Sequence, residues 1–157
     1  QEIIINVPEN LPLVLGDQTR LIQVVTNLVS NAHKYSPPES TITITAKVIQ
    51  SDDEILTERN KNRKQKVKYS SPYLYCTVSD TGIGMSEDDL RKLFRERYFR
   101  SDDQRAKEQP GTGLGMMITQ TIMQLHHGEI WVSSQLDVGT TFHLLIPLAP
   151  ERELASD

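Results

Sequence analysis

The chain has 157 residues, of which 37% are hydrophobic and 24% charged, and its 17 basic and 21 acidic side chains leave a net charge of −4. These values are typical of one globular domain with enough apolar residues for a core, and they exclude a global positive field that would attract nucleic acid or anionic lipid. No apolar run approaches the roughly 20 residues of a membrane span, and the first ten residues do not resemble a signal peptide. We therefore expect a cytoplasmic domain, and leave open whether its parent protein is anchored in a membrane.

The N-terminal part of the chain predicts a strand followed by a long helix. A short strand at residues 2–6 and a proline-bounded connection lead to Asp17, a good helix N-cap. From Thr19 to about Tyr35 the apolar residues cover most of a helical circumference, so we expect this helix to be buried on more than one side. The prolines at 37–38 end it. The apolar residues concerned are Leu21, Ile22, Val24, Val25, Leu28, Val29 and Ala32.

Two alternating segments, residues 41–49 and 73–80, predict strands that pair as neighbours. The second contains the single cysteine, Cys76, which can form no internal disulfide and which we interpret as an inert core thiol. The intervening residues 50–71 are polar and rich in Lys and Arg. They could form a nucleic-acid patch, but no aromatic residue is interleaved until Tyr69, so a solvated hairpin loop is the preferred interpretation.

The C-terminal half predicts two further helices and a hairpin. Ser86 is an N-cap with Asp89 three residues later, and Leu90, Leu93 and Phe94 form the stripe of a short helix. Residues 97–113 are charged and poor in aliphatic residues, which predicts a long mobile loop that acts as a lid. A second helix begins at Leu114, with Gly128 in a C-cap position. Its expected apolar stripe is Met117, Ile118, Thr121, Ile122 and Leu125. The segments EIWVSSQ and TTFHLLIPL then form a hairpin, and residues 149–157 a disordered tail.

A polar seam runs along the first helix. Arg20, Gln23, Asn27, Asn31 and Lys34 are spaced 3, 4, 4 and 3 residues apart, which aligns them on one face. A solvent-exposed stripe is one interpretation, but solvent-exposed helix faces usually carry Glu and Lys, whereas this seam has two asparagines at its centre. The other interpretation is a site for a magnesium-bound polyphosphate, because an amide oxygen is a suitable Mg²⁺ ligand and a lysine can bind phosphate.

Two glycine-rich segments add to this pattern. DTGIG, residues 80–84, follows a strand and is either a plain turn or a close approach to a planar ligand, with Asp80 able to accept a hydrogen bond from an exocyclic amino group such as that of adenine. GTGLG, residues 111–115, precedes a helix and is either a flexible hinge or a phosphate cradle at the helix N-terminus. It matches neither the dinucleotide fingerprint nor a P-loop.

Together these segments resemble the catalytic ATP-binding domain of sensor histidine kinases, within the superfamily that also contains gyrase, Hsp90 and MutL. The resemblance covers residues 16–148 and rests on five segments in the family order. They are GDQTRLIQVVTNLVSNAHKYS, VSDTGIGM, LFRERYFRSD, GTGLGMMIT and HHGEIWVSSQLDVGTTFHLLIPL. It implies an α+β fold, a two-layer α/β sandwich in which three helices pack on a mixed sheet of about five strands, with ATP between the helical layer and the lid.

The resemblance also implies roles for individual residues. Asn31 would bind Mg²⁺, with Asn27 orienting metal-bound water or phosphate. Tyr35 would pack on adenine, although a core aromatic remains an alternative, and Asp80 would bind its amino group. The other implied ATP-binding residues are Lys34 and Arg100 at the phosphates, Gly82, Gly84, Thr140 and Thr141 at the base, and Gly111, Gly113, Leu114 and Gly115 on the phosphate side of the lid.

Two departures from the family pattern leave questions open. The run between Phe94 and Arg100 is one residue longer than usual, so either Arg97 or Arg100 could meet the phosphates. The insertion at 50–71 has no assigned role.

The resemblance implies a kinase rather than a hydrolase. Other branches of the superfamily carry a glutamate base where this chain has Asn27, so transfer to a histidine is favoured over efficient hydrolysis. A hydrolysing ATPase and an ATP-gated interaction module remain alternatives.

No histidine in the chain lies in the family's phosphoacceptor motif. The four are His33, His126, His127 and His143, and we interpret the pair at 126–127 as a surface helix end rather than a metal site. We therefore expect an isolated catalytic domain, itself a monomer, whose acceptor lies in an upstream dimerisation domain of a homodimeric kinase that serves a response regulator.

Overall fold

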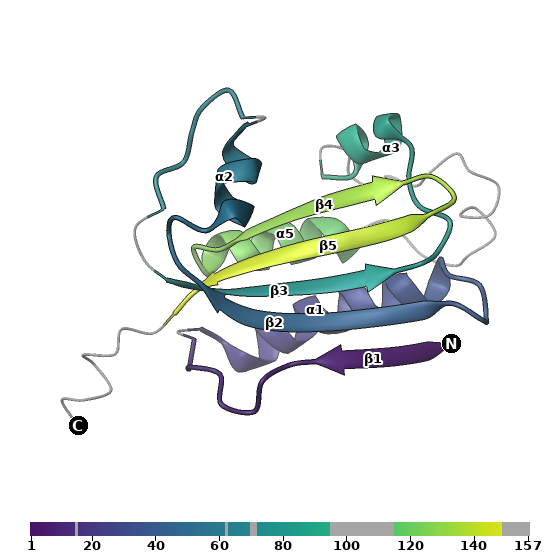
Figure 1. Ribbon diagram of the computed structural model, residues 1–157, viewed down its shortest axis with the longest axis horizontal. Coiled ribbons are helices and arrows are strands. Elements are labelled where there is room, and N and C mark those ends of the chain that lie inside the picture. The colour runs from purple at the N-terminus through teal and green to yellow at the C-terminus, as the bar shows by residue number, and fades with distance from the viewer. Residues whose placement is uncertain (15, 62, 70–71, 95–114, 149–157) are drawn as a thin grey trace.

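The computed structural model describes residues 1–14, 16–61, 63–69, 72–94 and 115–148. Its centre is a five-stranded sheet in the order β1-β2-β3-β5-β4 (Figure 1). Strand β1 pairs parallel to β2, and all other neighbours are antiparallel. The strands are β1 (Glu2–Asn6), β2 (Thr41–Ile49), β3 (Tyr73–Asp80), β4 (Glu129–Gln135) and β5 (Gly139–Pro147). The expected mixed sheet of an α+β fold is therefore confirmed.

The helical layer consists mainly of α1 (Gln18–Lys34) and α5 (Gly115–Leu125), which lie together behind the sheet in Figure 1. The short helix α3 (Glu87–Lys92) follows β3. Both expected N-caps are confirmed: Asp17 accepts a hydrogen bond from the backbone N–H of Arg20, and Ser86 accepts one from that of Asp89. Each satisfies a helix donor that has no partner within its own helix.

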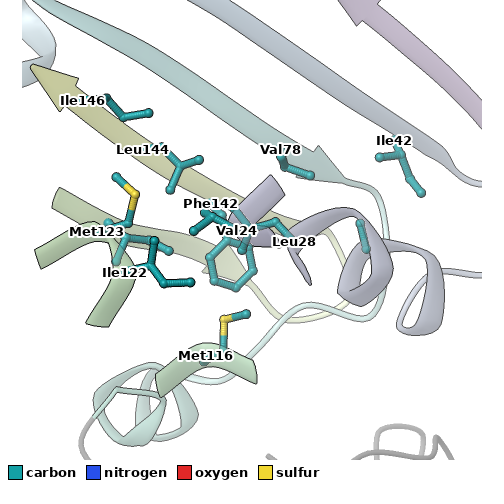
Figure 2. Close-up of a cluster of buried hydrophobic side chains, with 12 residues drawn as sticks. Val24, Leu28, Ile42, Val78, Met116, Ile122, Met123, Phe142, Leu144 and Ile146 are labelled. Atoms are coloured by element: carbon teal, nitrogen blue, oxygen red, sulfur yellow. The ribbon is translucent and has the colours of Figure 1, made fainter. Parts of the chain in front are cut away.

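The main core lies between these helices and the inner face of the sheet (Figure 2). The sheet contributes alternate residues of its central strands, as the period-two pattern predicts. From α1 the fully buried residues are Val24, Leu28 and Ala32, whereas Ile22 is 55% exposed. The expectation that α1 is buried on more than one side is therefore wrong, because α1 packs on the sheet and α5 through one face only.

Helix α5 turns a different face to the core from the one expected. Met116, Thr119, Ile122 and Met123 are buried, and Met116, Ile122 and Met123 point into the core in Figure 2. In the expected stripe only Ile122 is buried, while Ile118 is 42% and Leu125 74% exposed. Because α5 is apolar on two neighbouring faces, periodicity alone could not decide which one packs.

The end of α5 also differs in detail from the prediction. His127, not Gly128, adopts the left-handed conformation, with φ 58°. The N–H of His127 donates to Gln124 and that of Gly128 to Met123, the pattern of a Schellman motif. Gly128 is needed for close packing instead, since a Cβ there would lie 2.4 Å from the carbonyl oxygen of Leu145.

The expectation of a solvated loop at 50–71 is wrong for its first half, which forms helix α2 (Glu54–Lys61). Leu56 is 1% exposed and packs on the outer face of the sheet. Its buried partners are Ile49, Tyr75 and Leu145. The insertion therefore covers part of the sheet face opposite α1 and α5.

An ion pair and a cation–π contact join α2 to β4. The Nε of Arg59 lies 2.8 Å from Glu129, and its guanidinium lies 4.3 Å from the ring centre of Trp131. Arg63 binds the same carboxylate. Burial alone would raise the pKa of Glu129, but hydrogen bonds from Arg59, Tyr69 and Arg63 outweigh it and lower the pKa. Arg59 and Arg63 of the basic insertion at 50–71 therefore hold it against β4.

Two smaller expectations can be compared with the structure. Burial raises the pKa of the Cys76 thiol to about 11, which is consistent with the expected inert thiol because little reactive thiolate forms at neutral pH. Within the described ranges, no helix has the length and apolar character needed to cross a membrane.

Candidate functional site

The candidate site lies where the C-terminal end of α1 meets the C-terminal end of β3. Helix α1 ends at Lys34, and the carbonyl oxygen of Tyr35 accepts a hydrogen bond from the N–H of Ile83 at 3.1 Å. The turn after α1 and the DTGIG segment are thereby held together, although 45 residues separate Tyr35 from Asp80 in the sequence. The polar seam and Asp80 therefore border one site.

Asp80 is the acidic residue of this site. Its Oδ1 accepts hydrogen bonds from the N–H of Gly82 at 2.9 Å and of Thr140 at 3.3 Å. Burial raises its pKa, while these two N–H groups and the nearby Ser36 hydroxyl act in the opposite direction. A half-buried carboxylate held in this way is a fixed acceptor with capacity for further donors.

The two threonines of the GTTF segment lie on opposite faces of the sheet, as adjacent strand residues must. Thr140 pairs with Asp80 and lies beside it. Thr141 instead points to the outer face, where its Oγ1 lies 2.7 Å from Ser79 Oγ. Its expected contact with the base is therefore corrected, and only Thr140 remains in the site.

The structure gives a packing reason for both glycines of DTGIG. A Cβ on Gly82 would lie 2.3 Å from the carbonyl oxygen of Tyr35, and one on Gly84 would lie 2.1 Å from that of Gln135. Gly84 also has a φ of 69°, which favours glycine. Both glycines thus allow this loop to pack against neighbouring backbone, independently of any ligand.

The polar seam of α1 divides into anchored and free side chains. Arg20 donates to Gln23 at 3.2 Å near the exposed start of the helix. Asn27 donates to the buried Thr119 of α5 at 3.3 Å. Asn31 and Lys34, by contrast, have no side-chain partner within the described part of the chain. The two free groups occupy the turn of α1 nearest to Asp80.

Several expected site residues lie outside the described residues. They are Arg97, Arg100, Gly111, Gly113 and Leu114. Gly115 is the first residue of α5, and a Cβ there would meet no atom within 4 Å.

Two further polar residues, Thr119 and Ser36, belong to the site but were not expected from the sequence. Thr119 accepts the hydrogen bond from Asn27, but its place in a mostly apolar helix gave no indication of this contact. Ser36 has a buried hydroxyl close to Asp80. The one feature of the sequence that could have indicated Ser36 is its position directly after Tyr35, which was already an expected site residue.

Comparison with known proteins identifies the family of this site. The model of the histidine kinase-, DNA gyrase B-, and HSP90-like ATPase family matches residues 16–150. The chain belongs to this family. The match includes both Asn31 and Asp80.

Histidine kinases are among the similar curated proteins. The adaptive-response sensory kinase SasA of Synechococcus elongatus is 38% identical over 94% of this chain. The sensor histidine kinase WalK of Bacillus subtilis is 34% identical over 97% of it. The chain spans 32% of SasA and 22% of WalK, so it matches one part of each.

Solved histidine kinases in the same family share the fold. The mycobacterial sensor histidine kinase MprB has a TM-score of 0.71 and 26% identity, covering 95% of this chain and 84% of that one. Full-length ShkA, solved in complex with AMPPNP, has a TM-score of 0.69 and 26% identity, covering 94% of this chain and 26% of that one. The chain is therefore an ATP-binding domain of the histidine kinase type.

The polar groups at the site fit Mg-ATP. Among the described residues, no group of three or more His, Cys, Asp or Glu side chains could hold a metal ion. Mg²⁺, however, is usually bound by one or two protein oxygens together with phosphate oxygens and water. The Asn31 amide and the Lys34 ammonium, which have no partner within the described residues, would suit such a metal–polyphosphate group.

Proposed function

We propose that this domain binds Mg-ATP and transfers the γ-phosphoryl group to a histidine on a separate, upstream dimerisation domain, which then serves a response regulator in two-component signalling. One observation carries the proposal. Within the described residues, Asn31 and Lys34 have no side-chain partner on the last turn of α1, and the half-buried acceptor Asp80 lies at the end of β3, which the Tyr35–Ile83 hydrogen bond holds against the end of α1. A nucleotide with its base at Asp80 and its phosphates along α1 would satisfy all three groups.

Each residue then has a defined task. The Asp80 carboxylate accepts from the adenine 6-amino group, with Thr140 beside it and Tyr35 packed on the base. The Asn31 amide oxygen binds Mg²⁺ and Lys34 neutralises phosphate charge. Arg100 or Arg97, together with the GTGLG segment, would complete the phosphate side from outside the described residues. Bound Mg²⁺ supplies charge neutralisation during transfer.

The identity of residue 27 favours transfer over hydrolysis. Asn27 is a neutral amide, and its donation to Thr119 fixes its orientation. It cannot take a proton from water, whereas a neutral imidazole needs little deprotonation before it attacks phosphorus. Phosphoryl transfer depends mostly on positioning and charge neutralisation, which Lys34 and the nucleotide-binding residues can provide.

Three of the four described histidines already have side-chain partners, which favours an acceptor outside this domain. His126 accepts from the N–H of Asp17 at 3.0 Å, and its Nδ1 lies 2.8 Å from the carbonyl oxygen of Ile122. Both nitrogens of His143 contact hydroxyl groups, and Nδ1 of His33 contacts Gln1. These side chains have structural partners that a phosphoacceptor or a metal ligand would have to give up.

A surface groove formed mainly by α5, with Arg20 of α1, suits the partner domain. It has a volume of 390 Å³ and is lined by Arg20, Met117, Ile118, Thr121, Ile122, Leu125 and His126. Leu125 is 74% exposed there. A largely apolar groove of this kind fits an amphipathic helix. We propose that a helix of the dimerisation domain docks on it.

The direct test is phosphorylation of a separately supplied dimerisation domain from the matching kinase. With Mg-ATP, the wild-type domain should label the acceptor histidine, and removal of Mg²⁺ should abolish labelling. Leu125→Ala should keep ATP affinity but slow the transfer, because it changes only the groove. Failure to label an active, matched acceptor would contradict the proposed kinase function.

The alternatives make different predictions. A hydrolysing ATPase should release phosphate by itself at rates well above background. An ATP-gated interaction module should bind nucleotide and a partner normally without labelling any acceptor. Either outcome, together with failure to label the matched acceptor, would preserve nucleotide binding at Asp80 while excluding phosphoryl transfer as the function.

A further inference from the structure

Ser36 and Asp80 come together across Gly82. A Cβ placed on Gly82 would lie 2.8 Å from Ser36 Oγ and 2.9 Å from Asp80 Oδ1. The hydroxyl of the turn after α1 and the carboxylate at the end of β3 therefore flank the same small space. This arrangement depends on the absence of a side chain at residue 82.

The Ser36 hydroxyl is an exception among the buried polar groups. Its Oγ is excluded from solvent and lies close enough to the Asp80 carboxylate to help lower its pKa. Within the described residues, however, it is the one buried side-chain nitrogen or oxygen that makes no hydrogen bond of normal geometry. The neighbouring Ser40, in the same turn, donates to the carbonyl oxygen of Pro37 at 2.6 Å. A buried hydroxyl without a partner is unfavourable, so its presence needs an explanation.

The Asp80 carboxylate has capacity for another donor. Both of its backbone donors, Gly82 and Thr140, bind Oδ1. An ionised carboxylate can accept about four hydrogen bonds over its two oxygens. One more donor would help to fix the orientation of the group and would also satisfy the Ser36 hydroxyl.

We propose that Ser36 is a positioning residue for base recognition, whose hydroxyl donates to the Asp80 carboxylate, directly or through one water, when adenine is bound. The bond holds the carboxylate in the orientation that accepts the 6-amino group of the base. Ser36 thereby contributes to the preference for adenine without touching it. The inference rests on the proposed position of adenine at Asp80.

Two nucleotides and two serine variants test this role. ATP carries the 6-amino group, whereas purine riboside triphosphate lacks it and keeps the rest of the molecule. Ser36→Ala removes the hydroxyl without a partner, and Ser40→Ala removes a matched hydroxyl from the same turn. Dissociation constants with Mg²⁺ and melting temperatures are measured for each domain.

The two variants should show opposite effects. Ser36→Ala should weaken ATP about tenfold but purine riboside triphosphate less than about twofold, because the lost bond acts through the amino group. Its melting temperature should stay the same or rise, since Ser36 makes no hydrogen bond of normal geometry in the nucleotide-free fold. Ser40→Ala should lower the melting temperature and leave ATP affinity unchanged. Ser36→Cys, with its much weaker donor, should show the same base-dependent loss.

The contradicting outcomes are distinct. An equal loss for both nucleotides, or no loss for either, would overturn the role of Ser36. Failure of the wild-type domain to bind ATP would instead overturn the nucleotide site on which the inference rests. A loss of phosphoryl transfer with these binding differences intact would concern the proposed kinase function alone.

Discussion

At the scale of single residues, Asp80 combines opposing influences on its charge. Burial raises its pKa, and the backbone N–H groups of Gly82 and Thr140 partly offset this effect. Only the ionised carboxylate has all its oxygen lone pairs free to accept from the 6-amino group. The preference for adenine should therefore depend on pH.

The preference for ATP over purine riboside triphosphate should fall as the pH is lowered towards the raised pKa of Asp80. The ratio of the two dissociation constants is the measurement, because titration of the triphosphate cancels in it. Asp80→Asn, which cannot titrate, should give a ratio independent of pH. A constant ratio in the wild-type domain would contradict this role of Asp80.

Residue patterns predicted part of the site and missed part of it. The seam containing Asn27 and Asn31 follows from helical spacing, and Asp80 from its position before two glycines. Thr141 was misplaced because adjacent strand residues alternate faces, and strand register decides which one meets Asp80. The role of Ser36 could not be predicted either, because its burial results from a contact between distant segments.

At the scale of the elements, α2 was missed although its ends carry helix signals. Asp53 accepts a hydrogen bond from the N–H of Ile55 at 2.9 Å, Glu54 begins the helix, and Arg59 and Lys61 end it. This order of charges complements the helix dipole. With only two adjacent apolar residues, Ile55 and Leu56, the segment has no periodic stripe, so its packing on the sheet could not be inferred.

Truncation of Leu56 tests whether α2 is part of the folded unit. Leu56→Ala should reduce the free energy of unfolding by about 2–4 kcal/mol, because a fully buried side chain is lost. The matched change Leu125→Ala, at a 74% exposed position, should cost less than about 0.5 kcal/mol. Denaturant unfolding compares the two. Equal, small losses would contradict the packing of α2.

At the scale of the whole molecule, the candidate site lies at one end of the sheet and the α2 insertion joins the sheet at the other. Asp80 pairs with Ile42 and Thr140 at one end of β3, while Tyr73 pairs with Ile49 and Pro147 at the other, where the α2 insertion begins and ends. The insertion therefore supports the fold at a distance from the nucleotide site. The overall topology could be predicted from the ordered motifs, whereas the outer layer at α2 could not.

The outer face also makes the stability of the whole domain depend on pH. His143 stacks on Trp131 with ring centres 5.0 Å apart, and its Nδ1 lies 2.5 Å from the Tyr75 hydroxyl. Burial, with a smaller effect from the charge of Arg59, lowers its pKa from 6.5 to about 4. The folded domain therefore keeps His143 neutral at pH values where the unfolded chain protonates it.

The contribution of His143 to stability should be complete above pH 6.5 and lost as the pH falls towards about 4. After allowance for partial solvent exposure, the loss should be roughly 2 kcal/mol. Free energies of unfolding measured across this range should show a shallower decline in His143→Gln than in the wild-type domain. Parallel declines would exclude His143 as a source of acid sensitivity.

The central claim is that Mg-ATP binds along the last turns of α1, with Asn31 on the metal. It is tested most directly by calorimetric titration of ATP, with and without Mg²⁺, into the wild-type domain and Asn31→Asp. The wild-type domain should bind Mg-ATP, and the variant should bind it at least about tenfold more weakly, because a carboxylate replaces the neutral ligand beside the phosphates. Unchanged affinity for Mg-ATP in Asn31→Asp would contradict the account.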